Sequence, residues 1–282
     1  MKTREVAKLP PLERLLYWIR EREGIRLRRE AGEHKPWTDD GVMQRYRFCN
    51  VRRMDDRVSR WLLENWYGLN FGHPNMLVAC ALARHFNQPE ALEAIGFPCR
   101  WEPERIKKVL RAMKVRGKRI FNGAYMVRGI GTADKTEMVV TNVCQPLVRN
   151  PPGLNASSMR GSVEALLPYW GFSYFMAGQV VADLRWAVPG TWKDAKTWAP
   201  VGPGSKRGMN RLENRLPTAP LSQAMFEKKL LEVINYCSEQ LPRVITKRLE
   251  AIDWQNCLCE FDKYERTIHG EGKPKQLYPG LA

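Results

Sequence analysis

Apolar residues recur every three or four positions along most of this chain, which is the spacing that puts them on one face of a helix. Val58, Trp61 and Leu62 form one such set. This pattern predicts helices over residues 12–22, 57–67, 75–86, 89–95, 104–115, 162–167, 172–186, 207–212, 221–239 and 253–266. Residues 137–143 alternate between apolar and polar side chains and predict a short strand, and residues 122–127 fit either state. The predicted fold class is therefore mainly α with a minor β element.

The breaks between these helices are rich in glycine, proline and asparagine, near residues 128–136, 145–158 and 187–204. We predict three parts along the chain: an N-terminal helical extension of residues 1–40, a main helical domain of residues 41–268, and a tail of residues 269–282. The tail is polar and contains several glycines and prolines, so it is expected to be flexible.

Charge is the feature of the composition that says most about partners. With 46 lysines and arginines against 30 aspartates and glutamates, the 282 residues carry a formal net charge of +16. This excess predicts a polyanionic partner, and nucleic acid is the commonest. The longest apolar run, Met76 to Ala83, is too short to span a bilayer. The N-terminus has no apolar signal segment and the 7 cysteines fit a reducing compartment, so we expect a cytoplasmic protein without a membrane partner.

Several enzyme classes are disfavoured because their motifs are missing. The chain has no G-x-x-x-x-G-K-[ST] loop of a kinase or ATPase, no H-E-x-x-H and no G-x-S-x-G. Cys257 and Cys259 have no second pair at zinc spacing, and the 4 histidines are scattered. We therefore predict neither a metal site nor a cofactor.

The positive charge is concentrated between Lys107 and Arg119, where seven basic residues occur without an acid. The apolar positions Ile106, Val109 and Leu110 predict a helix with one buried stripe and a basic outer face. We predict that this face contacts DNA phosphates, and the alternative is a solvated basic surface. The predicted DNA-binding residues are Lys107, Lys108, Arg111, Lys114, Arg116, Lys118 and Arg119, together with Gly171 of the turn described next.

Two glycine-bearing segments have the composition of phosphate-binding turns. Residues 167–177, Leu-Pro-Tyr-Trp-Gly-Phe-Ser-Tyr-Phe-Met-Ala, predict two helices joined by a hairpin at Gly171, as in a helix-hairpin-helix that binds a DNA phosphate. Ser173 replaces the second glycine of that pattern, and an ordinary turn between helices is the alternative. Residues 201–211, Val-Gly-Pro-Gly-Ser-Lys-Arg-Gly-Met-Asn-Arg, predict an anion-binding loop that opens a helix, and the alternative is a linker.

Two further segments combine carboxylates with cations. Residues 47–58 place four arginines and two aspartates around Asn50, which fits either recognition of a phosphate or base edge or a surface cluster of ion pairs. On a helix over residues 253–266, Cys259, Asp262 and Lys263 share a face, as do Glu260 and Tyr264. That arrangement fits an acid–base pair with shifted pKa values or a structural ion pair.

Four motifs occur together in order: R-F-x-N-V-x-R-x-x-D-R-V, F-M-A-x-Q-V-V-x-D-L, G-P-G-S-[KR]-R-G-x-N-R-L and L-C-E-F-D-K-Y-x-R. Over residues 42–266 the chain thus resembles the phage amino-acid:DNA transferases, also called α-glutamyl/putrescinyl thymine pyrophosphorylases. The resemblance implies a fold like the helix-hairpin-helix DNA glycosylases. It also implies hypermodification of thymine in duplex DNA, within the host cytoplasm for a phage-encoded protein. By this resemblance, a separate P-loop kinase would phosphorylate 5-hydroxymethyluracil in the DNA, and this chain would then replace the phosphate with an amino acid such as glycine, or with a polyamine.

Site residues follow from these motifs. The resemblance implies catalytic roles for Asp56, Asp183, Glu260, Asp262, Lys263 and Tyr264. It implies substrate binding by Asn50, Arg52, Arg57, Gln179, Gly202, Gly204, Ser205, Arg207 and Asn210, and we add Lys206, which with Arg207 could bind the leaving phosphate. Asp55 before Asp56, and Gln255 in place of a glutamate, depart from the family pattern and could change which amine is accepted.

The chemistry expected of such a site leaves several points open. The target base must leave the stack, and Tyr125, Trp170 and Trp198 are candidates to stack on it. One of Asp56, Asp183, Glu260 and Asp262 would deprotonate the amine, while Arg52 or Arg57 could clamp an amino-acid carboxylate. Direct displacement, prior loss of phosphate and addition of Cys49 to the base are alternatives. So are two other functions, a base-excision glycosylase and a non-catalytic DNA-binding module. The sequence identifies neither the amine donor nor the oligomeric state.

Overall fold

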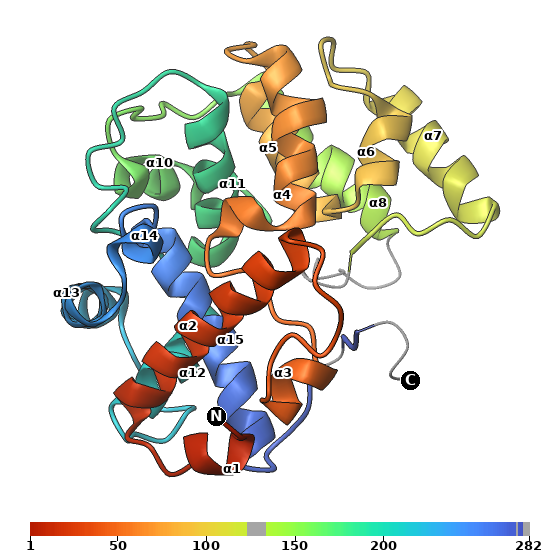
Figure 1. Ribbon diagram of the computed structural model, residues 1–282. Helices are drawn as coiled ribbons and strands as arrows, with labels where there is room; N and C mark the ends of the chain where they lie inside the picture. Colours follow the sequence, from red (N-terminus) through yellow and green to blue (C-terminus); the bar gives the residue numbers. More distant parts are fainter. Residues whose placement is uncertain (123–133, 275, 279–282) are drawn as a thin grey trace. The chain divides into compact units, whose positions relative to one another are not determined.

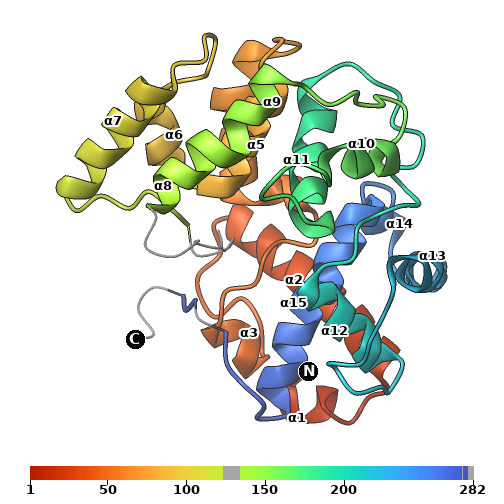
Figure 2. The same cartoon turned by 180° about the vertical axis from the view of Figure 1, so that it is seen from behind.

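A computed structural model describes residues 1–122, 134–274 and 276–278, and helices make up most of it (Figures 1 and 2). The longer helices are α2 (Pro11–Glu30), α5 (Met76–Phe86), α7 (Pro103–Val115), α10 (Met159–Leu166), α11 (Tyr174–Ala187), α12 (Pro203–Leu212), α13 (Gln223–Gln240) and α15 (Ala251–Ile268). The shorter ones are α1 (Thr3–Val6), α3 (Gly41–Arg45), α4 (Arg57–Leu62), α6 (Pro89–Ile95), α8 (Lys135–Met138), α9 (Gln145–Arg149) and α14 (Arg243–Thr246). Four single turns complete the set, the 3₁₀ turns η1 (Arg53–Asp55) and η3 (Gly68–Asn70) and the π turns η2 (Leu63–Tyr67) and η4 (Val139–Cys144).

The prediction of a mainly α fold is confirmed, and the residues that begin and end helices explain why. α6 begins at Pro89 and ends before Gly96, whose φ of 70° favours glycine. Ser222 caps α13 by accepting a hydrogen bond from the Met225 amide. In the described parts of the chain, no helix is both long and apolar enough to cross a membrane.

The predicted strand over residues 137–143 is wrong, because these residues belong to α8 and η4. Asp134 caps α8 through the Thr136 amide, and Val139, Val140 and Val143 are all buried. A short run of buried β-branched residues has the same appearance in a strand and in a buried helix. Among the described residues, the β structure is an isolated antiparallel bridge between Tyr46 and Leu277. Most of the ambiguous stretch 122–127 lies outside the described residues.

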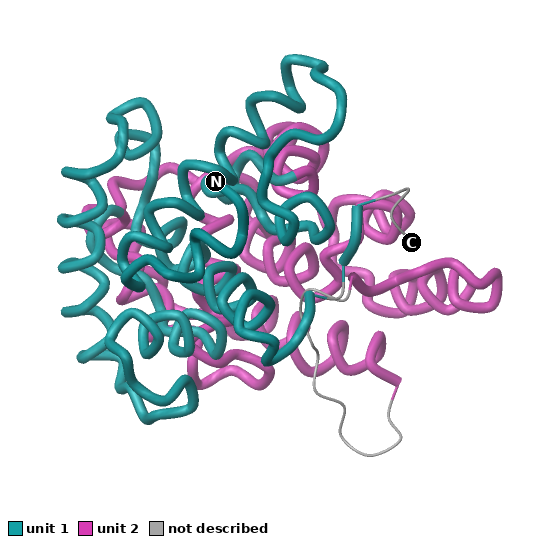
Figure 3. Tube along the Cα trace, turned by 60° about the horizontal axis from the view of Figure 1, so that its bottom comes forward, with its two compact units in different colours: residues 1–56, 196–282 teal, residues 57–195 magenta. Residues whose placement is uncertain are grey.

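The chain divides into two compact units (Figure 3). Unit 1 contains residues 1–56 and 196–282, and unit 2 contains residues 57–195. The expected boundaries at residues 40 and 268 stay a prediction. In unit 1, α2 and α12 lie alongside α15 (Figures 1 and 2), and Arg14 of α2 forms a bidentate ion pair with Glu265 of α15 at 2.7 Å.

The glycines of residues 201–211 do not form the predicted loop, because α12 already begins at Pro203, with Gly202 as its N-cap. Gly204 and Gly208 lie one turn apart on the side of α12 that contacts α15. A Cβ at Gly208 would lie 2.1 Å from the backbone oxygen of Leu258, and one at Gly204 would lie 2.2 Å from Cys259 Sγ. These glycines therefore allow the two helices to approach closely, and anion binding by the first turn of α12 stays a prediction.

Unit 2 is built around α5 and α11, which pack against each other. The predicted turn is present, since residues 167–173 join α10 to α11 with Gly171 at φ 87° and Ser173 as the N-cap of α11. A Cβ at Gly171 would lie 2.7 Å from a methyl carbon of Val143, so glycine is required for space as well as for conformation. Binding of a DNA phosphate by this turn stays a prediction.

Candidate functional site

Two carboxylates of unit 1 are bound by successive backbone amides. The Cys49 amide donates to Glu260 Oε2 at 3.0 Å, and the Asn50 amide donates to Asp56 Oδ1 at 2.9 Å. Glu260 comes from the middle of α15, whereas Asp56 ends the segment that carries the amides. Residues from the first and last sequence motifs are therefore held side by side by backbone hydrogen bonds.

The electrostatics of this pair depend on burial and on one lysine. Burial, with a smaller contribution from the nearby Glu260, raises the pKa of Asp56 to about 6, against the lowering effects of the Asn50 amide and Arg22. Asp56 Oδ2 forms no hydrogen bond with any described residue. Lys263, one turn along α15, forms an ion pair with Glu260. Burial lowers the pKa of Lys263, but Glu260, Cys49 and Cys259 together more than offset this, so the pKa is raised and the ammonium is retained.

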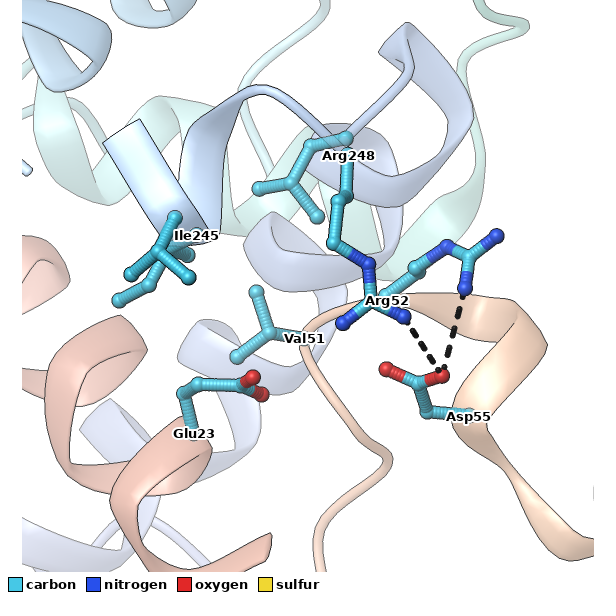
Figure 4. A pocket seen from close by; sticks show the side chains of 8 residues that line it. Glu23, Val51, Arg52, Asp55, Ile245 and Arg248 are labelled. Atoms are coloured by element: carbon cyan, nitrogen blue, oxygen red, sulfur yellow. Dashed lines mark hydrogen bonds and ion pairs between the residues drawn. The ribbon is translucent and has the colours of Figure 1, made fainter. Parts of the chain in front are cut away.

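The remaining polar residues of the first motif hold the segment in place. Asn50 donates from Nδ2 to the Asp55 carbonyl at 2.6 Å and accepts from Arg22 at Oδ1, so its amide is occupied by the fold. Arg52 and Arg248 both reach Asp55 Oδ1, at 3.4 and 3.5 Å, beside a small pocket (Figure 4). The volume of this pocket is about 10 Å³, roughly that of one water molecule, so it does not hold a base or an amino acid. Substrate binding by Asn50 and Arg52 stays a prediction.

Asp262 is the fully buried centre of an arginine cluster. Arg207 and Arg211 of α12 donate from Nε to Oδ2 and Oδ1 at 2.8 and 3.0 Å, and Arg266 Nε lies 3.4 Å from Oδ2. Both carboxylate oxygens are thus occupied by guanidinium groups, which favours an anchoring role over a role as base.

Three other predicted residues of unit 1 are buried in contacts of the fold. Tyr264 donates to Asp40 Oδ2 at 2.5 Å, and burial followed by Asp40 raises the pKa of its hydroxyl far above the usual value. Asn210 donates to the carbonyls of Pro217 and Ala219, and Ser205 Oγ accepts from Gln255 at 3.0 Å. Gln255, one of the two departures from the family pattern, therefore contacts α12. The stacking candidate Trp198 is also buried, with its indole N–H bound to Glu227.

The predicted residues of unit 2 have different surroundings. Asp183 of α11 is 2% exposed, accepts from the Tyr67 hydroxyl at 2.6 Å and forms a bidentate ion pair with Arg84 at 2.5 and 2.7 Å. Gln179 of α11 is buried as well, whereas Arg57 is exposed at the start of α4. Asp183 is fully occupied in a buried ion pair, and this suits structure better than proton transfer. Trp170 is 37% exposed, and Tyr125 lies outside the described residues.

The basic helix α7 has the predicted buried stripe, since Ile106 and Leu110 are fully covered. Acids neutralise three of its cations, although no acid occurs between Lys107 and Arg119 in the sequence. Lys107 is buried and pairs with Glu104 at 2.6 Å, while Arg111 pairs with Glu137 at 3.1 Å and Lys114 with Asp134 at 2.9 Å. These acids lie outside the basic run in sequence. Within the described ranges, no ion pair is made by the exposed side chains of Lys108, Arg116, Lys118 and Arg119.

We expect the double variant Lys118→Ala/Arg119→Ala to bind duplex DNA more weakly, with a shallower dependence on salt. Each lost phosphate contact lowers the slope of log affinity against log salt by roughly 0.9, so the slope should fall by about two. Titrations of labelled duplex at several salt concentrations measure it. The charge-matched variant Arg243→Ala/Lys247→Ala, on α14 and just after it, should keep the slope. Equal slopes for both variants would contradict a phosphate-binding role for the segment that follows α7.

Several residues of the site were not predicted from the sequence. Arg266 follows Asp262 by four positions on one helix, and Arg207 precedes Arg211 by four, so helical spacing was a usable signal for both pairs. Arg84 and Asp183 are 99 positions apart, and no local pattern joins them. The pairing of Glu260 with the Cys49 amide likewise depends on tertiary structure, with 211 positions between them.

Comparison with known proteins defines the family. Residues 10–274 match the family described as the helical domain of 5-hmdU DNA kinase. The chain belongs to this family. This helical domain is 31% identical over 224 residues to a 5-hmdU DNA kinase of Bacillus phage SP10, a match that covers 69% of the chain and 35% of that kinase. The helical domain thus spans about a third of the length of its curated relative. No solved structure is significantly similar to it.

Proposed function

We propose that this helical domain acts on 5-hydroxymethyluracil in DNA, as a transferase that replaces the phosphate of the phosphorylated base with an amine. The C–O bond to the phosphate breaks, the phosphate leaves with the bonding electrons, and a C–N bond forms to an amino acid or polyamine. The description of the family and the name of the phage relative both refer to 5-hmdU in DNA. The observation that carries the proposal is the pair of carboxylates, Asp56 and Glu260, on successive amides beside Lys263.

The incoming amine is protonated near neutral pH and must lose a proton before it attacks carbon. A base whose pKa lies near the working pH serves best, and Asp56, at about 6, meets this condition with one oxygen free of hydrogen bonds to described residues. Glu260 with Lys263 would hold the amine or shuttle its proton. Asp183, Asp262 and Tyr264 contribute structure in this proposal, because each is occupied in a buried contact.

The rate of amine transfer is expected to rise with pH through about 6, because Asp56 acts as base only when it is deprotonated. Asp56→Asn should lower the rate roughly a hundredfold or more, and the rate of this variant should no longer rise with pH near 6. The raised pKa also makes unfolding easier as the pH rises from about 4 towards 6, so folding is checked at each pH. Asp39→Asn, at an exposed position, is the matched control. If the rate of Asp56→Asn still rises with pH through about 6, Asp56 is not the base.

Release of inorganic phosphate tests the proposed function. Duplex DNA that contains phosphorylated 5-hydroxymethyluracil is incubated with the protein, with and without a pool of amino acids and polyamines. We expect phosphate release only when an amine is present, and a large loss of rate in Glu260→Gln but not in Glu239→Gln, an exposed position of α13. Release that does not depend on an amine would contradict transfer.

A non-catalytic role in presenting DNA to a kinase is the second candidate. It is favoured by the match of residues 10–274 to a family described as the helical domain of a DNA kinase. In that case no phosphate would be released, while DNA binding would still depend on salt. A base-excision glycosylase has less support, since Asp194, the acidic residue between α11 and α12, accepts hydrogen bonds from the Met159 and Arg160 amides at the start of α10.

A further inference from the structure

Two arginines that are partly exposed converge on one buried carboxylate oxygen. Arg207 Nε lies 2.8 Å and Arg266 Nε 3.4 Å from Asp262 Oδ2. The Asp262 side chain is 0% exposed, whereas those of Arg207 and Arg266 are 35% and 32% exposed. The two side chains, one from α12 and one from α15, are therefore partly exposed while sharing one buried anchor.

The charges around this anchor do not balance. Arg211, the third arginine on Asp262, also forms an ion pair with Glu271, and the pKa of Glu271 is lowered mainly by its hydrogen bond to Arg211. Three guanidinium groups thus face two carboxylates, which leaves one positive charge uncompensated. For Arg207 and Arg266, Asp262 is the ion-pair partner within the described residues. An anion is the ligand that such a surface favours.

We propose that Arg207 and Arg266 form the binding site for the phosphomonoester of the modified base, with Asp262 as their positioning residue. The proposal rests on the function proposed above and names the group that its substrate must present. A phosphate offers oxygens to two planar guanidinium forks at once, and Asp262 orients both forks before the ligand arrives. Asp262 is therefore a positioning residue and not the base.

The positions of Arg207 and Arg266 fit binding of the phosphate that leaves the base. Lys263 and Arg266 lie three residues apart on α15, and Glu260 precedes Arg266 by six, or about 9 Å along the helix axis at 1.5 Å per residue. If the two arginines bind a phosphate, Lys263 would thus lie between that phosphate and the carboxylate pair of Asp56 and Glu260. Lys206 is displaced by about 100° around α12 from Arg207, because an α-helix has 3.6 residues per turn. Joint action of Lys206 and Arg207 on the phosphate stays a prediction, whereas Arg207 and Arg266 share a carboxylate anchor.

Binding of two matched duplexes to the full chain tests this site. One duplex carries a single phosphorylated 5-hydroxymethyluracil, and the other carries thymine at that position. We expect the wild type to prefer the phosphorylated duplex, and Arg207→Gln and Arg266→Gln each to lose roughly tenfold in affinity for it, with less than twofold change for the thymine duplex. Arg243→Gln, an exposed arginine of α14, removes the same charge and should keep the preference. Arg266→Lys should recover part of the affinity, because it restores the charge without the fork.

Three results would overturn the assignment. Equal losses on both duplexes would mean contact with backbone phosphates, unchanged affinities would mean no phosphate site, and full recovery in Arg266→Lys would mean that only the charge matters. The phosphate site and the proposed transferase function can also be rejected independently of each other. Selective binding without amine transfer would reject the proposed function and keep this site, whereas transfer with unchanged selectivity in both glutamine variants would do the opposite.

Discussion

Gly208→Ala is expected to lower the free energy of unfolding by about 3 kcal/mol or more, as the overpacking of a fixed contact predicts. The new Cβ would lie 2.1 Å from the oxygen, 2.8 Å from the carbonyl carbon and 3.2 Å from the Cα of Leu258. All three atoms are backbone atoms of α15, so no side chain can rotate away. The two helices must separate, and their separation would also move Arg207 away from Asp262.

Gly24→Ala provides the matched control, because Gly24 is also inside a helix. The three atoms nearest to its Cβ would belong to the guanidinium end of Arg28, the first at 3.1 Å, and this flexible side chain can move. Alanine is favoured over glycine in a helix by roughly 1 kcal/mol, so Gly24→Ala should be neutral or slightly stabilising. Urea unfolding curves measure both variants. Equal midpoints for Gly208→Ala and the wild type would contradict the close contact between α12 and α15.

Arg84→Met is expected to cost about 3–5 kcal/mol of stability in unit 2, because it leaves the charge of Asp183 buried without its ion-pair partner. The Arg84 and Asp183 side chains are 4% and 1% exposed. The double variant Arg84→Met/Asp183→Leu removes both charges and should recover much of the loss, since an apolar pair needs no ionic partner. Thermal or urea unfolding of the single and double variants measures the coupling between the two residues.

The control for this prediction is an ion pair on the surface of the same unit. Arg105 and Glu102 have side chains 44% and 54% exposed, so Arg105→Met should change stability by less than about 1 kcal/mol. A cost for Arg84→Met no larger than that for Arg105→Met would show that the buried pair does not stabilise unit 2.

Helices were predictable where local residues determine where they begin and end. Pro89 and Gly96 bound α6 by their own backbone preferences, and the apolar stripe of α7 follows from its spacing. The sequence predicts a strand over residues 137–143 instead of a helix because a short run of buried β-branched residues looks the same in both. Gly-Pro-Gly before residue 205 predicts a loop because it is typical of turns, but proline at the first helical position and glycines four apart also fit a tightly packed helix, which is what α12 forms.

The residues of the candidate site were predictable from the sequence, but the groups that they contact were not. Motif resemblance selected Asp56, Glu260 and Lys263, and the structure brings them together through the amides of Cys49 and Asn50. Those amides cannot be recognised from the sequence, because every residue except proline supplies a backbone N–H. Other side chains that the same motifs select, such as Asp183 and Tyr264, are bound to buried partners more than 90 positions away in the sequence.

Mass spectrometry of nucleosides tests the central claim most directly. Duplex DNA with phosphorylated 5-hydroxymethyluracil is incubated with the protein and a pool of amino acids and polyamines, and the DNA is then digested. The proposed transferase predicts a nucleoside whose mass reflects loss of phosphate and gain of one amine, and this mass identifies the donor. Abasic sites, or an unchanged phosphorylated base despite salt-dependent binding of the DNA, would contradict it.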